Sequence, residues 1–322
     1  MRKRCGSSWL VLPDPLSVEL GTLAAESKRL GRWRYGTVST VRRSLALDET
    51  TGKMCRVDAT TRNNVTVLGH HHSPTLLLAH GFGCDQHLWR LVAPVLSERF
   101  RVVLFDHVGS GRSDSSAWSA ERYSTLDAYA EDVLEICSEL DLRDVVLVGH
   151  SVSAMIAVLA ANRDADRFAK LVLLTPSPCY VDDGDYRGGF SRADVEELLE
   201  SLDSNYLGWS ATMAPVIMGN ADHPELGGEL TDSFCRTDPM IAGAFARATF
   251  LSDNRADLPE VAVPTLVIQT AQDAIASQEV GRFVHEQIAG SELVTLDATG
   301  HCPQLSAPEA TTAAIFAFAG AQ

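Results

Sequence analysis

The chain has 322 residues, of which 45% are hydrophobic and 21% are charged, and its net charge at neutral pH is −15. This length and composition predict a buried core, either one large α/β domain with an insertion or two smaller domains. The negative charge repels phosphate backbones and anionic lipids, and no apolar run reaches the roughly 18 residues that span a bilayer, so we expect neither a nucleic-acid nor a membrane partner.

Residues 1–60 show no sustained hydrophobic period and mix basic residues with turn formers. We interpret them as an N-terminal extension that is partly disordered. Their apolar run, Trp9 to Leu12, is too short for the core of a secretion signal. The seven cysteines of the chain show neither Cys-x-x-Cys pairs nor zinc-ligand spacing, which is typical of a reducing compartment. A cytoplasmic protein is therefore expected.

From Thr75 onward, short aliphatic runs alternate with segments of helical period. Runs without polar alternation are typical of parallel strands that are covered on both faces. Strands that alternate with helices indicate a mostly parallel sheet flanked by helices, and we assign residues 61–175 and 254–322 to this core. The predicted strands are Thr75–Ala79, Val102–Phe105, Val145–Gly149, Leu171–Leu174, Thr265–Gln269 and Glu292–Leu296.

The alternation stops over residues 176–253, which show helical patterns only. Val195, Leu198, Leu199 and Leu202, for example, recur at the spacing of one helix face. Because ligands of open α/β sheets bind at the carboxyl ends of the strands, an insertion between two strands can form a lid there. We predict a helical lid above a pocket.

A nucleophile is predicted at Ser151, within the run Gly149-His150-Ser151-Val152-Ser153. The run follows a strand and begins a helix, which is the context of a nucleophile elbow. The turn is so sharp that only small residues fit two positions before and after the serine. Gly149 fits this requirement, and Ser153 also does, although glycine is more usual there.

Two further turns follow strands. His80-Gly81-Phe82-Gly83 lies where this kind of fold supplies one backbone N–H to an oxyanion hole, and the residue after the nucleophile supplies the other. The predicted donors are Phe82 and Val152. Residues 106–113, Asp-His-Val-Gly-Ser-Gly-Arg-Ser, lack the third glycine of a dinucleotide fingerprint, so we interpret them as a structural turn.

The serine needs a base and an acid that orients the base, and in this fold they follow in the order acid, then histidine. Asp273 follows the strand Thr265–Gln269, and His301 follows the strand Glu292–Leu296. Both strand ends lie at the same edge of the sheet as Ser151. Asp297 is the alternative acid, but it is too close to His301 along the chain for the usual arrangement.

Five segments together resemble one subgroup of the α/β-hydrolase superfamily, the one that holds the bacterial energy-stress regulator RsbQ and the plant strigolactone and karrikin receptors. The resemblance runs from about Arg62 to the C-terminus and implies the α/β-hydrolase fold with a small apolar pocket under the lid. By motif, it places Phe82, Phe190, Trp209, Met213 and Phe250 in that pocket. The segments are residues 79–86, 106–113, 149–155, 176–180 and 300–303.

These features predict a serine hydrolase that acts on a small apolar ester or lactone by acyl transfer, with no metal or organic cofactor. The alternative is a signalling module resembling RsbQ, in which hydrolysis or sensing of a small ligand acts on a protein partner such as a PAS-domain phosphatase. The sequence does not decide between these two functions.

Overall fold

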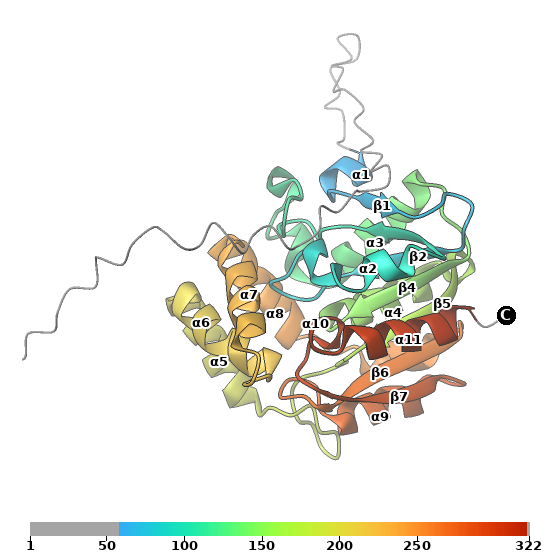
Figure 1. Cartoon of the computed structure of the whole chain (residues 1–322). Helices are drawn as coiled ribbons and strands as arrows, with labels where there is room; N and C mark the ends of the chain where they lie inside the picture. The colour runs from blue at the N-terminus through green and yellow to red at the C-terminus, as the bar shows by residue number, and fades with distance from the viewer. Residues whose placement is uncertain (1–57, 321–322) are drawn as a thin grey trace, which may run out of the picture. The chain divides into compact units, whose positions relative to one another are not determined.

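The computed structural model describes residues 58–320, which form a seven-stranded sheet with helices on both faces (Figure 1). The strand order is β1-β3-β2-β4-β5-β6-β7; β1 is antiparallel to β3 and all other neighbours are parallel. The strands are β1 (Thr66–Leu68), β2 (Thr75–Ala79), β3 (Arg101–Leu104), β4 (Val145–His150), β5 (Phe168–Leu174), β6 (Thr265–Gln272) and β7 (Glu292–Thr299). All six predicted strands are present. β1 has no counterpart among them because three residues are too few to show a pattern.

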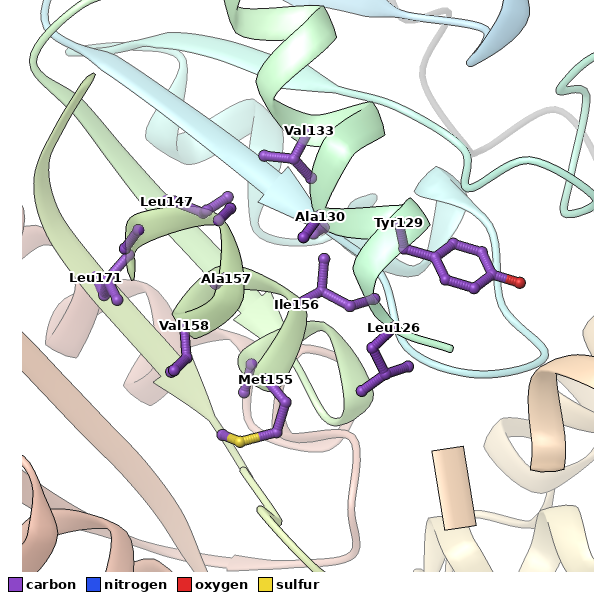
Figure 2. Close-up of a cluster of buried hydrophobic side chains, with 14 of the residues drawn as sticks. Leu126, Tyr129, Ala130, Val133, Leu147, Met155, Ile156, Ala157, Val158 and Leu171 are labelled. Atoms are coloured by element: carbon purple, nitrogen blue, oxygen red, sulfur yellow. The ribbon is translucent and has the colours of Figure 1, made fainter. Parts of the chain in front are cut away.

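Two apolar layers cover the sheet, since successive side chains of a strand point to opposite faces. Leu77 and Ala79 of β2 enter one layer, and Leu76 and Leu78 enter the other. The helices of the first layer are α3 (Asp127–Glu139), α4 (Val152–Arg163) and α9 (Gln278–Gln287), and those of the second are α2 (Ala93–Leu96) and α11 (Pro308–Gly320). Figure 2 shows part of the first layer, where side chains of α3 and α4 meet Leu147 of β4 and Leu171 of β5.

Four helices are inserted between β5 and β6 and lie together beside the sheet (Figure 1). They are α5 (Arg192–Ser204), α6 (Tyr206–Met218), α7 (Pro224–Cys235) and α8 (Pro239–Phe250). Their apolar faces form a separate cluster that also includes Cys84 and Cys302 of the sheet domain. The predicted face of Val195, Leu199 and Leu202 is buried in this cluster.

The prediction of helix throughout residues 176–253 is wrong for the first part. Residues 176–191 form an irregular loop with isolated bridges such as Cys179 to Asp253 and Val181 to Phe190. Pro176 and Pro178 prevent helical hydrogen bonding there, and Gly184 and Gly189 adopt positive φ angles of 59° and 105°.

The predicted N-terminal extension lies outside the described residues except for its last few positions. The described part begins at Asp58, whose side chain caps the short helix α1 (Ala59–Arg62).

None of the helices within residues 58–320 has the length and apolar character needed to cross a bilayer. The remaining short helix, α10 (Pro303–Ser306), follows β7 and leads into α11.

Candidate active site

Ser151 lies at the turn from β4 to α4 with φ of 57° and ψ of −124°, a conformation that L-residues rarely adopt. A Cβ on Gly149 would lie 2.1 Å from the carbonyl oxygen of Ser153, so no larger residue fits at position 149. The Ser151 N–H donates to the Leu174 carbonyl at 2.9 Å, which ties the turn to β5. Such strain costs roughly 1–3 kcal/mol and is held by the surrounding packing.

The structure brings Ser151, His301 and Asp273 together at the carboxyl ends of β4, β7 and β6. His301 Nε2 lies 2.7 Å from Ser151 Oγ, and His301 Nδ1 lies 2.7 Å from Asp273 Oδ2. The side chain of Asp273 is fully buried and that of His301 is 5% exposed. Asp297 instead points into solvent from β7 and takes no part.

The Asp273 carboxylate is held in its charged form. Burial by itself would raise the pKa of Asp273, but the charge and hydrogen bond of His301 and two backbone N–H groups outweigh it, so the pKa is lowered. These N–H groups belong to Ile275 and Ala276 and donate to Oδ1 at 2.8 and 3.1 Å. A carboxylate fixed in this way orients the imidazole and keeps the proton on Nδ1.

The main chain of His301 is fixed as well. Its carbonyl accepts hydrogen bonds from His150 Nε2 at 2.8 Å and from Thr175 Oγ1 at 3.1 Å, and its N–H donates to the Ile217 carbonyl at 2.9 Å. Burial and the neighbouring His301 lower the pKa of His150 to about 3, so the His150 ring is neutral. Ile217 belongs to α6, so the insertion contributes to the position of the histidine.

The two predicted donors are the backbone N–H groups of Val152, which follows Ser151 in the chain, and of Phe82, which lines the same cavity as Ser151. Neither has a hydrogen-bond acceptor within residues 58–320. A Cβ on Gly81 would lie 2.7 Å from His150 Nδ1 and 3.2 Å from Ser151 Cβ, so the loop before Phe82 is in direct contact with the elbow. Unpaired N–H groups beside a nucleophile are suited to donate hydrogen bonds to a developing oxyanion.

A small cavity of about 30 Å³ opens next to Ser151 and His301. Its wall is almost entirely apolar and comes from both the sheet domain and the insertion. The lining residues are Phe82, Cys84, His150, Ser151, Tyr180, Ile217, Leu230, Phe234, Thr249, Phe250, Ile275, His301 and Cys302. A larger open cleft of about 750 Å³ borders Asp273 and Gly300 but includes neither Ser151 nor His301. The small cavity is therefore the one that the serine can serve.

The residues predicted for the pocket divide into two groups. Phe82 and Phe250 line the cavity. Trp209 lies one layer behind: it is edge-on to Phe82 and stacked on Phe234, with ring centroids 6.1 and 5.8 Å apart. Phe190 and Met213 are half-buried and pack against the insertion cluster without reaching the cavity. The cavity wall differs from the expectation at these three positions: Trp209 and Met213 lie on α6, whose rotation is set by packing, and Phe190 lies in the irregular loop before α5.

Several lining residues carry no role in the sequence-based prediction, among them Tyr180, Phe234 and Cys302. Tyr180 belongs to a quoted motif segment, whereas Phe234 follows the helical period of α7 and could have been listed by face. Burial raises the pKa of Tyr180, so the phenol stays protonated in the cavity that holds Ser151. Its hydroxyl is the one polar group that the irregular loop contributes to this wall.

The turn at residues 106–113 is a structural element. The Asp106 carboxylate accepts hydrogen bonds from the N–H groups of Gln86 at 2.8 Å and Arg112 at 2.9 Å. It thus connects the end of β3 to the segment after Phe82.

No group of three or more His, Cys, Asp or Glu side chains within residues 58–320 is arranged to hold a metal ion.

Comparisons with known proteins identify the family and the fold of the chain. Residues 76–315 match the family model described as "Alpha/beta hydrolase family". The chain is 39% identical over 248 residues to karrikin insensitive 2 receptor CA of Petunia hybrida, covering 77% of this chain and 92% of the relative. It is 40% identical over 246 residues to a strigolactone esterase of Arabidopsis thaliana, covering 76% and 91%. Among solved structures, a hydrolase from Oleispira antarctica matches with a TM-score of 0.79 and 45% identity, covering 82% of this chain and 97% of that one.

Proposed function

The chain belongs to the alpha/beta hydrolase family, within the subgroup of the plant receptors, and has its fold; on this premise we propose that it hydrolyses small carboxylic esters or lactones with Ser151 as nucleophile. The single observation that supports this proposal most strongly is the continuous Ser151–His301–Asp273 hydrogen-bond chain at the wall of an apolar cavity. Packing alone does not require a serine, a histidine and an aspartate to be joined in one chain of hydrogen bonds.

In the proposed mechanism, His301 Nε2 takes the Ser151 proton as Oγ attacks the carbonyl carbon of the substrate. The oxyanion that forms accepts hydrogen bonds from the N–H groups of Phe82 and Val152. His301 then passes the proton to the leaving alcohol oxygen. A water molecule, deprotonated by His301 in the same way, then attacks the acyl carbon. The bond from this carbon to Ser151 Oγ breaks, Oγ takes the proton back from His301, and the acid leaves. Asp273 stays ionised throughout and stabilises the imidazolium.

The cavity limits the size of the group that binds beside Ser151. The volume of about 30 Å³ is small, so we expect compact substrates with short acyl groups to be preferred over long ones. Its apolar wall makes a charged acyl chain unfavourable. We therefore propose acetyl-sized acyl groups, or the compact ring of a small lactone, as the substrates that fit without movement of the insertion.

Replacement of the nucleophile tests the proposal. Ser151→Ala should reduce hydrolysis of a chromogenic acetate ester by about 10⁴- to 10⁶-fold, as for other triad nucleophiles, while the circular dichroism spectrum stays unchanged. Mass spectrometry should find a fluorophosphonate adduct on Ser151 of the wild type and none on the variant. Ser210→Ala, which removes a buried serine hydroxyl from α6, is the matched control. A variant at position 151 that keeps more than about a tenth of the wild-type rate contradicts the assignment.

A second candidate function is ligand-dependent signalling, favoured by the relatives that are named receptors, such as the one from Petunia hybrida. In this case, as in the predicted RsbQ-like module, hydrolysis or binding of the ligand would act on a regulatory protein partner. Turnover distinguishes the two functions. A metabolic esterase releases many products per enzyme, whereas a receptor-type module releases about one and stays acylated on Ser151 or closed around its product.

A further inference from the structure

Ser153 is where the elbow departs from the more usual glycine, and the structure gives its hydroxyl two partners. The side chain is fully buried. Its hydroxyl donates to the His80 carbonyl at 2.5 Å and accepts from His107 Nε2 at 2.7 Å. Ser153 thus joins the first turn of α4 to the ends of two other strands, β2 and β3.

The same two histidines are joined directly, and this fixes the tautomer of His80. Its Nε2 accepts the backbone N–H of His107 at 3.0 Å and therefore carries no proton. In the neutral ring the proton lies on Nδ1, which is 2.9 Å from the carbonyl oxygen of Gly81 and donates to it. Burial lowers the pKa of both His80 and His107, so both rings are neutral at neutral pH.

The Gly81 carbonyl belongs to the peptide unit whose N–H is that of Phe82. A trans peptide is planar, and its C=O and N–H point in opposite directions. A hydrogen bond that fixes the direction of the Gly81 C=O therefore also fixes the direction of the Phe82 N–H. The only other donor to this carbonyl within residues 58–320 is the Cys84 N–H, at the longer distance of 3.3 Å.

We propose that His80 is a positioning residue for the oxyanion hole, with Ser153 and His107 holding it in place. Its Nδ1–H holds the Gly81–Phe82 peptide with the N–H directed at the substrate and increases the polarity of that peptide. Ser153 completes a closed ring of hydrogen bonds. This ring connects the loop of residues 80–83, which carries the Phe82 N–H and is called the donor loop below, to α4, which begins with the second donor, Val152. The inference rests on the proposed function, because it concerns the oxyanion of that reaction.

Two variants of nearly equal shape isolate the donor. His80→Asn keeps an N–H group near the Nδ1 position, whereas His80→Leu keeps the branching and has no donor. Both variants lose the Nε2 acceptor, and both leave the backbone N–H of His107 unpaired. A difference between them therefore reports on the donor at the Nδ1 position alone. We expect kcat for an acetate ester to fall by about 10- to 100-fold in His80→Leu, since outright loss of one oxyanion donor costs about 10²- to 10³-fold. His80→Asn should recover about 10-fold of this loss, with KM within about 2-fold in all three proteins.

The affinity for a small boronic acid, whose adduct on Ser151 places an anionic oxygen in the hole, should follow kcat through the series. Thr311→Val is the matched control, because Thr311 is also fully buried and its hydroxyl donates to the Ala307 carbonyl, far from the site in α11. It should leave kcat unchanged. Equal kcat for the Asn and Leu variants, or a difference that lies in KM alone, would overturn the assignment of His80.

Ser153→Ala keeps the inference testable if the His80 variants do not fold. This change removes one hydroxyl without altering the Cβ that the elbow already accommodates. It should lower kcat by about 3- to 10-fold at unchanged KM, and a wild-type kcat would contradict the role of the ring of hydrogen bonds. Fluorophosphonate labelling of Ser151 separates failure of the proposed function from failure of this inference. If the wild type is not labelled, the proposed function is rejected. If the wild type is labelled but the variants keep the wild-type kcat, only the role of His80 and Ser153 is rejected.

Discussion

At the scale of single residues, the candidate site depends on groups held in states that they would not adopt in water. Ser151 has a positive φ angle because β4, α4 and the bond to the Leu174 carbonyl determine the turn. Asp273 is buried yet charged because His301 and two N–H groups compensate for lost hydration. Each state is stable only while its partners remain, so single substitutions here have large and specific effects.

Replacement of the buried acid should therefore change both activity and the pH dependence of stability. Asp273→Asn should lower kcat by about 10⁴-fold, because the amide favours the wrong imidazole tautomer. The folded pKa of Asp273 lies below its unfolded value of about 3.9, so its stabilising contribution is present above about pH 4 and is lost as the pH falls through the folded pKa.

Urea denaturation of the wild type and Asp273→Asn at several pH values measures this contribution. The difference in free energy of unfolding between the two proteins should shrink as the pH falls from about 5 to about 2. A difference that is constant over this range would show that Asp273 is not held in its charged form by the fold.

At the scale of elements, the inserted helices determine the space beside the serine. Helix α7 is attached to the segment after Phe82 at three points: the Ser233 hydroxyl donates to the Gly83 carbonyl at 3.0 Å, and ion pairs join Arg90 to Glu229 and Arg236 to Asp85. The ring of Phe82 also meets those of Trp209, Phe234, Phe245 and Phe250 with centroids 5.7–6.2 Å apart. The insertion and the donor loop therefore form one packed unit.

Truncation of two aromatic residues should separate cavity wall from supporting layer. Phe250→Ala removes a lining ring, so the preference for acetate over butyrate should decrease by about 10-fold or more, since one methylene is worth about 1–3 kcal/mol in an apolar pocket. Trp209→Ala should instead destabilise the protein by about 3–5 kcal/mol, with a much smaller change in acyl-length preference.

Melting temperatures and kcat/KM across an acyl-length series decide this prediction. If Trp209→Ala changes the acyl preference as strongly as Phe250→Ala does at little cost in stability, Trp209 belongs to the pocket, as its motif position first suggested.

At the scale of the whole molecule, the described part of the chain begins with a tightly bound segment. Arg62 of α1 forms ion pairs with Asp132 at 2.9 Å and Glu135 at 2.6 Å on α3, and the side chains of Arg62 and Asp132 are 8% and 0% exposed. Asn64 Nδ2 also donates to Asp106 at 2.7 Å, beside the turn that supports the donor loop. These contacts fix Arg62 and Asn64 to α3 and to the turn at residues 106–113, close to the predicted boundary of the N-terminal extension at residue 60.

Deletion experiments should find this boundary. Removal of residues 1–55 should leave the melting temperature and the esterase rate nearly unchanged, because this segment shows no hydrophobic period. Arg62→Ala in the full chain should lower the melting temperature by about 10 °C, since breaking a buried ion pair costs about 3–5 kcal/mol. A drop of about 10 °C on deletion of residues 1–55 would show that the extension packs against the domain.

The sequence by itself determined six of the seven strands of the sheet, the elbow and the order of the reactive residues. Each of these follows from residues that are close together in the chain: aliphatic runs of four or five, a serine between small residues, and an aspartate and a histidine within five residues after predicted strands. The strand ends of a parallel sheet meet at one edge, so three such local signals suffice to predict that Ser151, Asp273 and His301 come together, as they do in the structure.

Only the tertiary structure decided which side chains surround the serine and what holds the donor loop. Trp209 and Phe250 look alike in sequence, and the rotation of α6 and α8 in the cluster decides which one reaches the cavity. The bond from Ser153 to His80 joins residues 73 positions apart, and nothing local to either residue indicates the other. Contacts of this kind depend on the packing of whole elements, which a pattern along the chain does not contain.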